Sequence, residues 1–93
     1  MTVVFTDRAK KNFLKLDKPI QKQVQNFIIK LQKSENPRNS GKPLVGNLQG
    51  FWRYRVGDYR ILCKIIDEKL IISVIEIGHR KEIYKGISKN CNF

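Results

Sequence analysis

Residues Phe51–Ile77, FWRYRVGDYRILCKIIDEKLIISVIEI, carry the clearest structural signal in this sequence. Side chains in FWRYRV and YRILCKII follow the two-residue period of a β-strand, and LIISVIEI is a third, more apolar run. The turn sequences Gly57-Asp58 and Asp67-Glu68-Lys69 separate the three runs. The stretch therefore predicts three strands that form an antiparallel meander.

The residues before this meander predict a short strand and two helices. Residues 3–5 favour the strand, and Thr6 or Asp7 can cap a short amphipathic helix after it. A second cap at Asp17, with Pro19 in the first turn, precedes one apolar stripe. This stripe consists of Ile20, Val24, Phe27, Ile28 and Leu31. Two antiparallel helices packed on the antiparallel meander give an α+β fold, with the second helix ending before Asn36-Pro37.

Residues 32–50 form a long connection that holds two of the three prolines and three of the six glycines. Long irregular loops in compact domains are usually functional or mobile, so this segment is a candidate binding loop. The alternative is a surface crossover with Leu44, Val45 and Leu48 packed against the core.

The composition limits what the protein can bind. Its 93 residues predict one domain, 1–93, with a flexible tail at 87–93. The 19 Lys and Arg exceed the 8 Asp and Glu and give a net charge of +11. This excess is spread along the chain, so it predicts a folded basic surface that attracts polyanions such as nucleic acid.

Other functional classes are disfavoured by the same sequence. A membrane span needs about 20 apolar residues, and no run of that length is present, so we expect no membrane partner. The N-terminus has an apolar run before its charges, the reverse of a secretory signal, which predicts a cytoplasmic location. Two cysteines and one histidine are too few for a structural zinc site, so we expect neither metal nor cofactor.

The meander also predicts a cluster of arginines. A two-residue turn at Gly57-Asp58 places Arg55 opposite Arg60, with Arg53 on the same face. Like charges directly opposite each other destabilise a sheet, and a bound anion would relieve this repulsion. The next hairpin, with Ile66 paired to Leu70 or Ile71, brings His79 and Arg80 to the same corner.

Tyr84 follows closely enough to fold over this corner, so the cluster suits a phosphate with a stacked base. The opposite face, which includes Tyr54, Ile61, Cys63 and Ile65, would pack on the helices. The alternative is that each of these arginines is an ordinary solvated surface residue.

Two motifs, R-x-R-x-G-x-Y-R at 53–60 and G-H-R-x-x-x-Y at 78–84, resemble the RelE branch of the RelE/ParE superfamily of bacterial toxins. The resemblance covers residues 2–86. It implies a microbial-RNase-type fold and a ribosome-dependent endoribonuclease that cuts mRNA in the ribosomal A site. The 2′-hydroxyl of the RNA makes the cut, without metal. It also implies that the protein is the toxin of a type II toxin–antitoxin system.

Roles carried over from the family fall on matching positions of this sequence. The family's basic pair falls on Arg53 and Arg55, its two other arginines on Arg60 and Arg80, and its stacking tyrosine on Tyr84. With the neighbouring residues of the cluster added, the predicted catalytic residues are Arg55, Arg60, His79, Arg80 and Tyr84, and the predicted RNA-binding residues are Arg53, Lys42 and Lys81. Arg60 and Arg80 would stabilise the transition state, and Tyr84 would hold a base. Family members often have lysine where Arg55 stands, and an arginine is a poor general base. Glu82 and His79 are an alternative acid–base pair.

The resemblance also implies partners. These are a RelB-like antitoxin in a heterodimer or heterotetramer, the 70S ribosome with mRNA, and operator DNA bound by the toxin–antitoxin complex. Two other classes stay open: a ParE-like inhibitor of DNA gyrase without ribonuclease activity, and a plain nucleic-acid-binding module.

Overall fold

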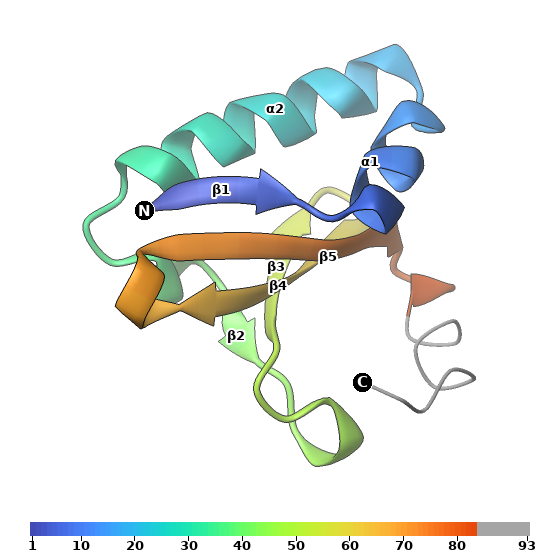
Figure 1. The fold of residues 1–93 in the computed structure, drawn as a ribbon. Helices are drawn as coiled ribbons and strands as arrows, with labels where there is room; N and C mark the ends of the chain where they lie inside the picture. The colour runs from blue at the N-terminus through green and yellow to red at the C-terminus, as the bar shows by residue number, and fades with distance from the viewer. Residues whose placement is uncertain (84–93) are drawn as a thin grey trace.

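The computed structural model describes residues 1–83 and shows two α-helices against a five-stranded sheet (Figure 1). Three short 3-10 helices lie in the connections of this part of the chain. In chain order the elements are β1 (Thr2–Phe5), α1 (Asp7–Leu14), α2 (Lys18–Lys33), η1 (Pro37–Ser40), β2 (Lys42–Pro43), η2 (Gly46–Leu48), β3 (Trp52–Val56), β4 (Tyr59–Ile66), η3 (Asp67–Lys69) and β5 (Ile71–His79).

The sheet has the strand order β1-β5-β4-β3-β2, so the predicted meander β3-β4-β5 is confirmed as its centre. All neighbouring strands are antiparallel except β1 and β5, which are parallel from Thr2 opposite Ile71 to Phe5 opposite Val74. Figure 1 shows these two strands side by side, in blue and orange. The sheet is therefore mixed, because the predicted N-terminal strand joins the far edge of the meander.

Both predicted helices are confirmed, but only the first has its predicted side-chain cap, because Asp17 makes no side-chain capping hydrogen bond at the start of α2. The hydroxyl of Thr6 accepts a 3.1 Å hydrogen bond from the amide of Ala9 and caps α1. Asp17 is the N-cap residue of α2 and Pro19 lies in its first turn. One face of each helix packs on the sheet in the main hydrophobic core. The buried residues of this core are Ala9, Val24, Leu31, Tyr54, Ile61, Cys63, Ile72, Val74 and Ile77.

Both hairpin turns hold the register that the sequence predicted. Gly57 has φ 58°, a left-handed conformation that glycine adopts without cost, and this turn pairs Arg55 with Arg60. At the second turn, Ile66 pairs with Ile71 across η3. The end of β5 therefore returns to the start of β4.

The long connection contains more regular structure than the sequence indicated. Its strand β2 pairs with β3 and becomes the outer edge of the sheet. Leu44 and Leu48 pack with the buried residues Leu62 and Ile83, in a second, smaller cluster. Leu62 alternates with the core residues Ile61 and Cys63, so this cluster lies on the sheet face away from the helices. Val45 is exposed, so the predicted packing of the loop holds for the two leucines only.

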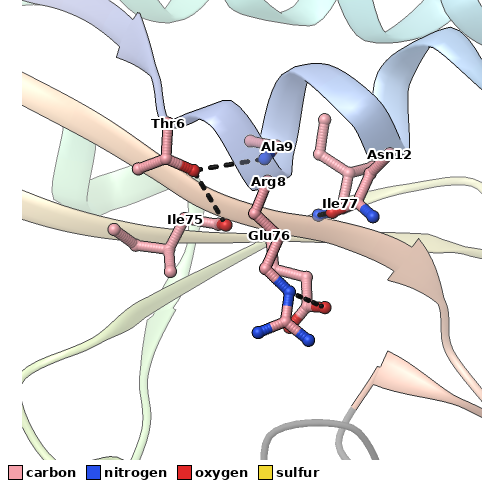
Figure 2. Close-up of polar contacts among 7 residues, drawn as sticks. All are labelled: Thr6, Arg8, Ala9, Asn12, Ile75, Glu76 and Ile77. Carbon is pink, nitrogen blue, oxygen red and sulfur yellow. Dashed lines mark hydrogen bonds and ion pairs between the residues drawn. The ribbon is translucent and has the colours of Figure 1, made fainter.

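A β-bulge in β5 was not predicted. The pairing shifts between Leu62 opposite Glu76 and Cys63 opposite Val74, which leaves Ile75 without an opposite residue. Strand β1 ends opposite Val74, so the β5 backbone after Val74 contacts α1 and its N-cap residue instead of β1. The hydroxyl of Thr6 donates to the carbonyl oxygen of Ile75, and the amide of Ile77 donates to Oδ1 of Asn12, each at 3.1 Å (Figure 2). Helix α1 thus satisfies part of an otherwise open strand edge.

Candidate nucleic-acid interface

Three predicted RNA-contacting side chains line one pocket at the β2 edge of the sheet. Lys42 pairs directly with Arg53, and Arg55 lies two positions along β3 on the same face. The pocket has a volume of about 150 Å³. We call it the basic pocket, and its lining residues are Asn39, Ser40, Gly41, Lys42, Arg53 and Arg55. Two guanidinium groups, an ammonium group and neighbouring polar side chains suit a phosphate.

Arg60 lies opposite Arg55 as predicted, but its environment differs. Arg55 is exposed, whereas Arg60 is only 6 % exposed. Nη1 of Arg60 donates to the carbonyl oxygens of Gly57 at 3.0 Å and Tyr59 at 2.9 Å. These contacts fix the buried guanidinium group at the hairpin turn, so its position is set before any ligand arrives.

Arg80 reaches the same hairpin turn from the end of β5. Its amide donates to the carbonyl oxygen of Asp58 at 2.8 Å, and its Nε lies 3.8 Å from Oδ1 of Asp58. Both side chains are largely exposed, so this ion pair is weak and a phosphate can compete for the guanidinium group. The prediction that the second hairpin brings Arg80 to the Arg60 end of the sheet is confirmed.

His79 lies at the predicted corner but on the other face. It pairs with Tyr59, and their rings meet edge to face at 5.6 Å between centroids. Paired residues point to the same side of a sheet, and Tyr59 precedes Arg60, so His79 and Arg60 lie on opposite faces. The expectation that His79 shares the face of the arginines is therefore wrong. Nδ1 of His79 accepts from the amide of Lys81 at 3.2 Å, which places the proton of a neutral imidazole on Nε2.

The remaining predicted residues lie at or beyond the end of the described chain. Lys81 and Glu82 are exposed in the turn that follows β5. Tyr84 lies outside the described residues, so its predicted stacking role remains a prediction.

Glu76 was not predicted and is a buried carboxylate on the arginine side of the sheet. It pairs with Leu62, which itself pairs with Arg53, so all three share one face. Glu76 is 8 % exposed, and its Oε1 lies 3.1 Å from Nε of Arg8. Figure 2 shows the Arg8 side chain extending from α1 past β5 to reach it. Burial raises the pKa of Glu76, while Arg8 opposes this shift. A single acidic residue within the apolar run LIISVIEI was the available signal.

Potential metal ligands do not gather within residues 1–83. No group of three or more His, Cys, Asp and Glu side chains in this range is placed to hold a metal ion. Cys63 is fully buried in the main core, where burial raises the pKa of its thiol to about 12. This thiol is therefore a core side chain rather than a metal ligand or nucleophile.

Comparison with known proteins identifies the family. Residues 3–84 match the family described as the ParE toxin of the type II toxin–antitoxin system parDE. The chain belongs to the RelE/ParE superfamily of toxins. As a member of this superfamily, it is a toxin of a type II toxin–antitoxin system.

Relatives of this RelE/ParE toxin carry RelE-type names. It is 36 % identical to toxin RelG of Mycobacterium tuberculosis over 84 residues, which cover 90 % of this chain and 95 % of RelG. It is 30 % identical to the mRNA interferase toxin RelE of Escherichia coli K12 over 88 residues, covering 91 % of this chain and 90 % of RelE.

Solved structures of RelE proteins share the fold. The RelBE2 toxin–antitoxin complex from M. tuberculosis contains a chain that is 36 % identical, with a TM-score of 0.77 over 85 % of this chain and 96 % of that chain. The isolated E. coli RelE toxin is 25 % identical, with a TM-score of 0.69 over 96 % of both chains.

Among residues 1–83, no helix has the length and apolar character to cross a membrane.

Proposed function

We propose that this toxin is a ribosome-dependent endoribonuclease that enters the ribosomal A site and cuts mRNA in the cytoplasm. The observation that carries the proposal is the convergence of Lys42, Arg53 and Arg55 in one pocket, with Arg60 opposite Arg55. The names of relatives, including an mRNA interferase at 30 % identity, support the same activity.

The reaction needs charge stabilisation more than any other assistance. Attack by the ribose 2′-oxygen on the adjacent phosphorus, with its proton passing to a base for which Glu82 is the candidate, forms a phosphorane with additional negative charge. Expulsion of the 5′-oxygen, which takes up a proton, leaves a 2′,3′-cyclic phosphate. Fixed guanidinium groups stabilise this charge more than they stabilise the starting diester. Arg60 is held in place by two carbonyl oxygens, and Arg80 is anchored through its backbone at the same turn. We assign them to the transition state and assign Lys42, Arg53 and Arg55 to phosphate binding. This route needs no metal.

The proton donor is the less constrained part of the mechanism. A general acid must protonate the leaving 5′-oxygen, and His79 can fill that role only as the imidazolium, so its Nδ1 must first give up the hydrogen bond that it accepts from Lys81. His79 projects from the opposite face to Arg60, so RNA would have to pass around the end of β5 to meet both groups. Tyr84 and Lys81 follow directly and would contact the RNA there.

Cleavage of mRNA on programmed ribosomes tests the proposal. We expect Arg80→Ala and Arg55→Ala to lower the single-turnover cleavage rate by at least tenfold, because each removes an exposed cation beside the scissile phosphate. Arg60→Lys retains a buried positive charge but loses the planar fork, so it tests Arg60 without vacating a buried site. Lys22→Ala is the matched control, because it removes one exposed charge from α2. Undiminished cutting by both Arg80→Ala and Arg55→Ala would contradict the proposal.

A gyrase inhibitor is the second candidate, and the match of residues 3–84 to the ParE family favours it. Such a toxin acts by binding protein and needs no ribonuclease site. Inducible expression separates the two activities: mRNA cleavage arrests translation and leaves new ends in cellular messages, whereas gyrase inhibition breaks DNA first. The arginines at the hairpin turn favour the ribonuclease.

We also propose a RelB-like antitoxin as the partner in a heterodimer or heterotetramer that binds operator DNA. The similar M. tuberculosis and E. coli toxins were solved as RelBE2 and RelBE toxin–antitoxin complexes. A net charge of +11 predicts an antitoxin rich in Asp and Glu, with an amphipathic helix that covers residues near 79–86. Co-expression with the neighbouring open reading frame and co-purification would test this pairing.

A further inference from the structure

A second pocket lies on the other side of the edge strand β2. The two residue pairs of the β2–β3 ladder alternate: Lys42 and Arg53 line the basic pocket, whereas Pro43 and Trp52 line the second one. This second pocket has a volume of about 220 Å³. We call it the aromatic pocket, and its lining residues are Arg38, Pro43, Gly50, Phe51, Trp52 and Ile65.

The orientation of Arg38 makes this pocket suited to a flat ring. The guanidinium carbon of Arg38 lies 5.9 Å from the centroid of the Trp52 ring. Nη1 and Nη2 of Arg38 both donate to the carboxylate of Asp67, at 3.0 Å and 2.9 Å. Because Asp67 occupies this edge of the guanidinium group, a bidentate phosphate contact there is disfavoured. One side of the group is turned toward Trp52, so a base would stack on the side turned away from it or on the indole.

We propose that the aromatic pocket binds a nucleobase of single-stranded RNA, while an adjoining phosphate occupies the basic pocket. The inference rests on the proposed RNA-cutting function and extends it with a base subsite. Planar cations and aromatic rings are the groups on which proteins stack unpaired bases. The neighbouring basic pocket and the net charge of +11 favour RNA over an apolar peptide as the occupant.

The edge strand allows one RNA strand to reach both pockets. Strand β2 has two residues and ends the strand order of the sheet. Adjacent residues of β3, Trp52 and Arg53, face the two pockets in turn. An RNA strand that crosses β2 would therefore place a base against Trp52 and a phosphate beside Arg53. Because stacking does not distinguish strongly among bases, this subsite would bind with little sequence preference.

The single tryptophan gives a direct measurement that does not depend on cleavage. Trp52 is the only tryptophan in the sequence, so its fluorescence reports on the aromatic pocket. We would titrate the protein with a 2′-O-methyl hexaribonucleotide, which lacks the attacking hydroxyl, and with an abasic chain of equal length and charge. The hexamer should quench Trp52 and bind about fivefold or more tightly than the abasic chain.

Two variants locate the effect. Phe51→Leu keeps an apolar side chain but removes the ring, and it should weaken hexamer binding about fivefold while leaving abasic-chain binding unchanged. Arg53→Gln should weaken both ligands, because it acts through phosphate. Lys22→Ala is the control for the loss of a distant positive charge, and thermal melting would verify that each variant is folded.

Failure of this inference can be separated from failure of the proposed function. Equal binding of both chains without quenching, and no effect of Phe51→Leu, would overturn the base subsite even if ribosomal cleavage occurs. Base-dependent quenching in a protein that cuts no mRNA on ribosomes would support the subsite while contradicting the ribonuclease.

Discussion

The hydroxyl of Tyr54 donates a buried 2.8 Å hydrogen bond to the carbonyl oxygen of Pro37. Tyr54 lies in β3 between Arg53 and Arg55, and both arginines line the basic pocket. Pro37 begins η1, the 3-10 helix that carries Arg38 to the aromatic pocket. This bond therefore ties η1 to β3, in addition to the pairing of β2 with β3.

Tyr54→Phe should destabilise the protein by about 1–3 kcal/mol, because it leaves a buried carbonyl oxygen without its donor. Packing of the ring against Phe27, at 5.4 Å between centroids, is preserved. Urea unfolding would measure the change. We expect RNA binding to weaken as well, since η1 loses its anchor to β3. An unchanged midpoint and slope would show that water replaces the tyrosine hydroxyl at no cost.

The sequence predicted those parts of the fold whose signals are local. Alternation and the Gly57-Asp58 turn determine the register of β3 and β4, so Arg55 was correctly placed opposite Arg60. The two-residue strand β2 has no periodicity to detect. The parallel pairing of β1 with β5 joins residues about seventy positions apart, and nothing in the local sequence marks it.

The candidate site was predicted less completely, for a related reason. Residues that meet at one corner of a sheet can still point to opposite faces. Counting positions along β5 from the turn did not give the correct face for His79. The bulge at Ile75 also changes which β5 side chains face the arginines, and bulges leave little trace in a single sequence. Glu76 was therefore missed, although its charge within an apolar strand was visible.

Two carboxylates should give the stability opposite dependences on pH. Burial raises the folded-state pKa of Glu76, so its protonated form contributes to the free energy of unfolding. This contribution is fully present below the unfolded pKa of about 4.5 and is lost as pH rises through the raised value. The hydrogen-bonded Arg38 lowers the pKa of Asp67. The Asp67 contribution is therefore present above its unfolded pKa of about 3.8 and is lost as pH falls through the lowered value.

Urea unfolding from pH 3 to pH 8 would measure both effects. As pH rises, the free energy of unfolding of wild type should fall relative to that of Glu76→Gln. Relative to Asp67→Asn, wild type should lose free energy of unfolding only at acid pH. Glu68→Gln, at an exposed position next to Asp67, is the control. Parallel stability curves for all four proteins would show that neither carboxylate is perturbed by folding.

Gly41 lies where the two pockets approach each other, and we expect it to tolerate no side chain. Its backbone is extended, with φ −140°, so the constraint is contact rather than conformation. A Cβ at Gly41 would lie 2.5 Å from the carbonyl oxygen of Arg53 and 2.7 Å from Nε1 and Cδ1 of Trp52. The first of these atoms is backbone and the indole is partly buried, so strand β2 would have to move away from β3.

Gly41→Ala should therefore destabilise the protein by about 1–3 kcal/mol, the usual cost of overpacking. It should also alter Trp52 fluorescence and weaken RNA binding at both pockets, because separating β2 from β3 displaces Lys42 and Pro43 together. Ser40→Ala, one position earlier and exposed, should change stability by less than about 0.5 kcal/mol. If Gly41→Ala behaved like Ser40→Ala in unfolding and fluorescence, the edge strand would be loosely held, and it could not position the two pockets for one RNA strand.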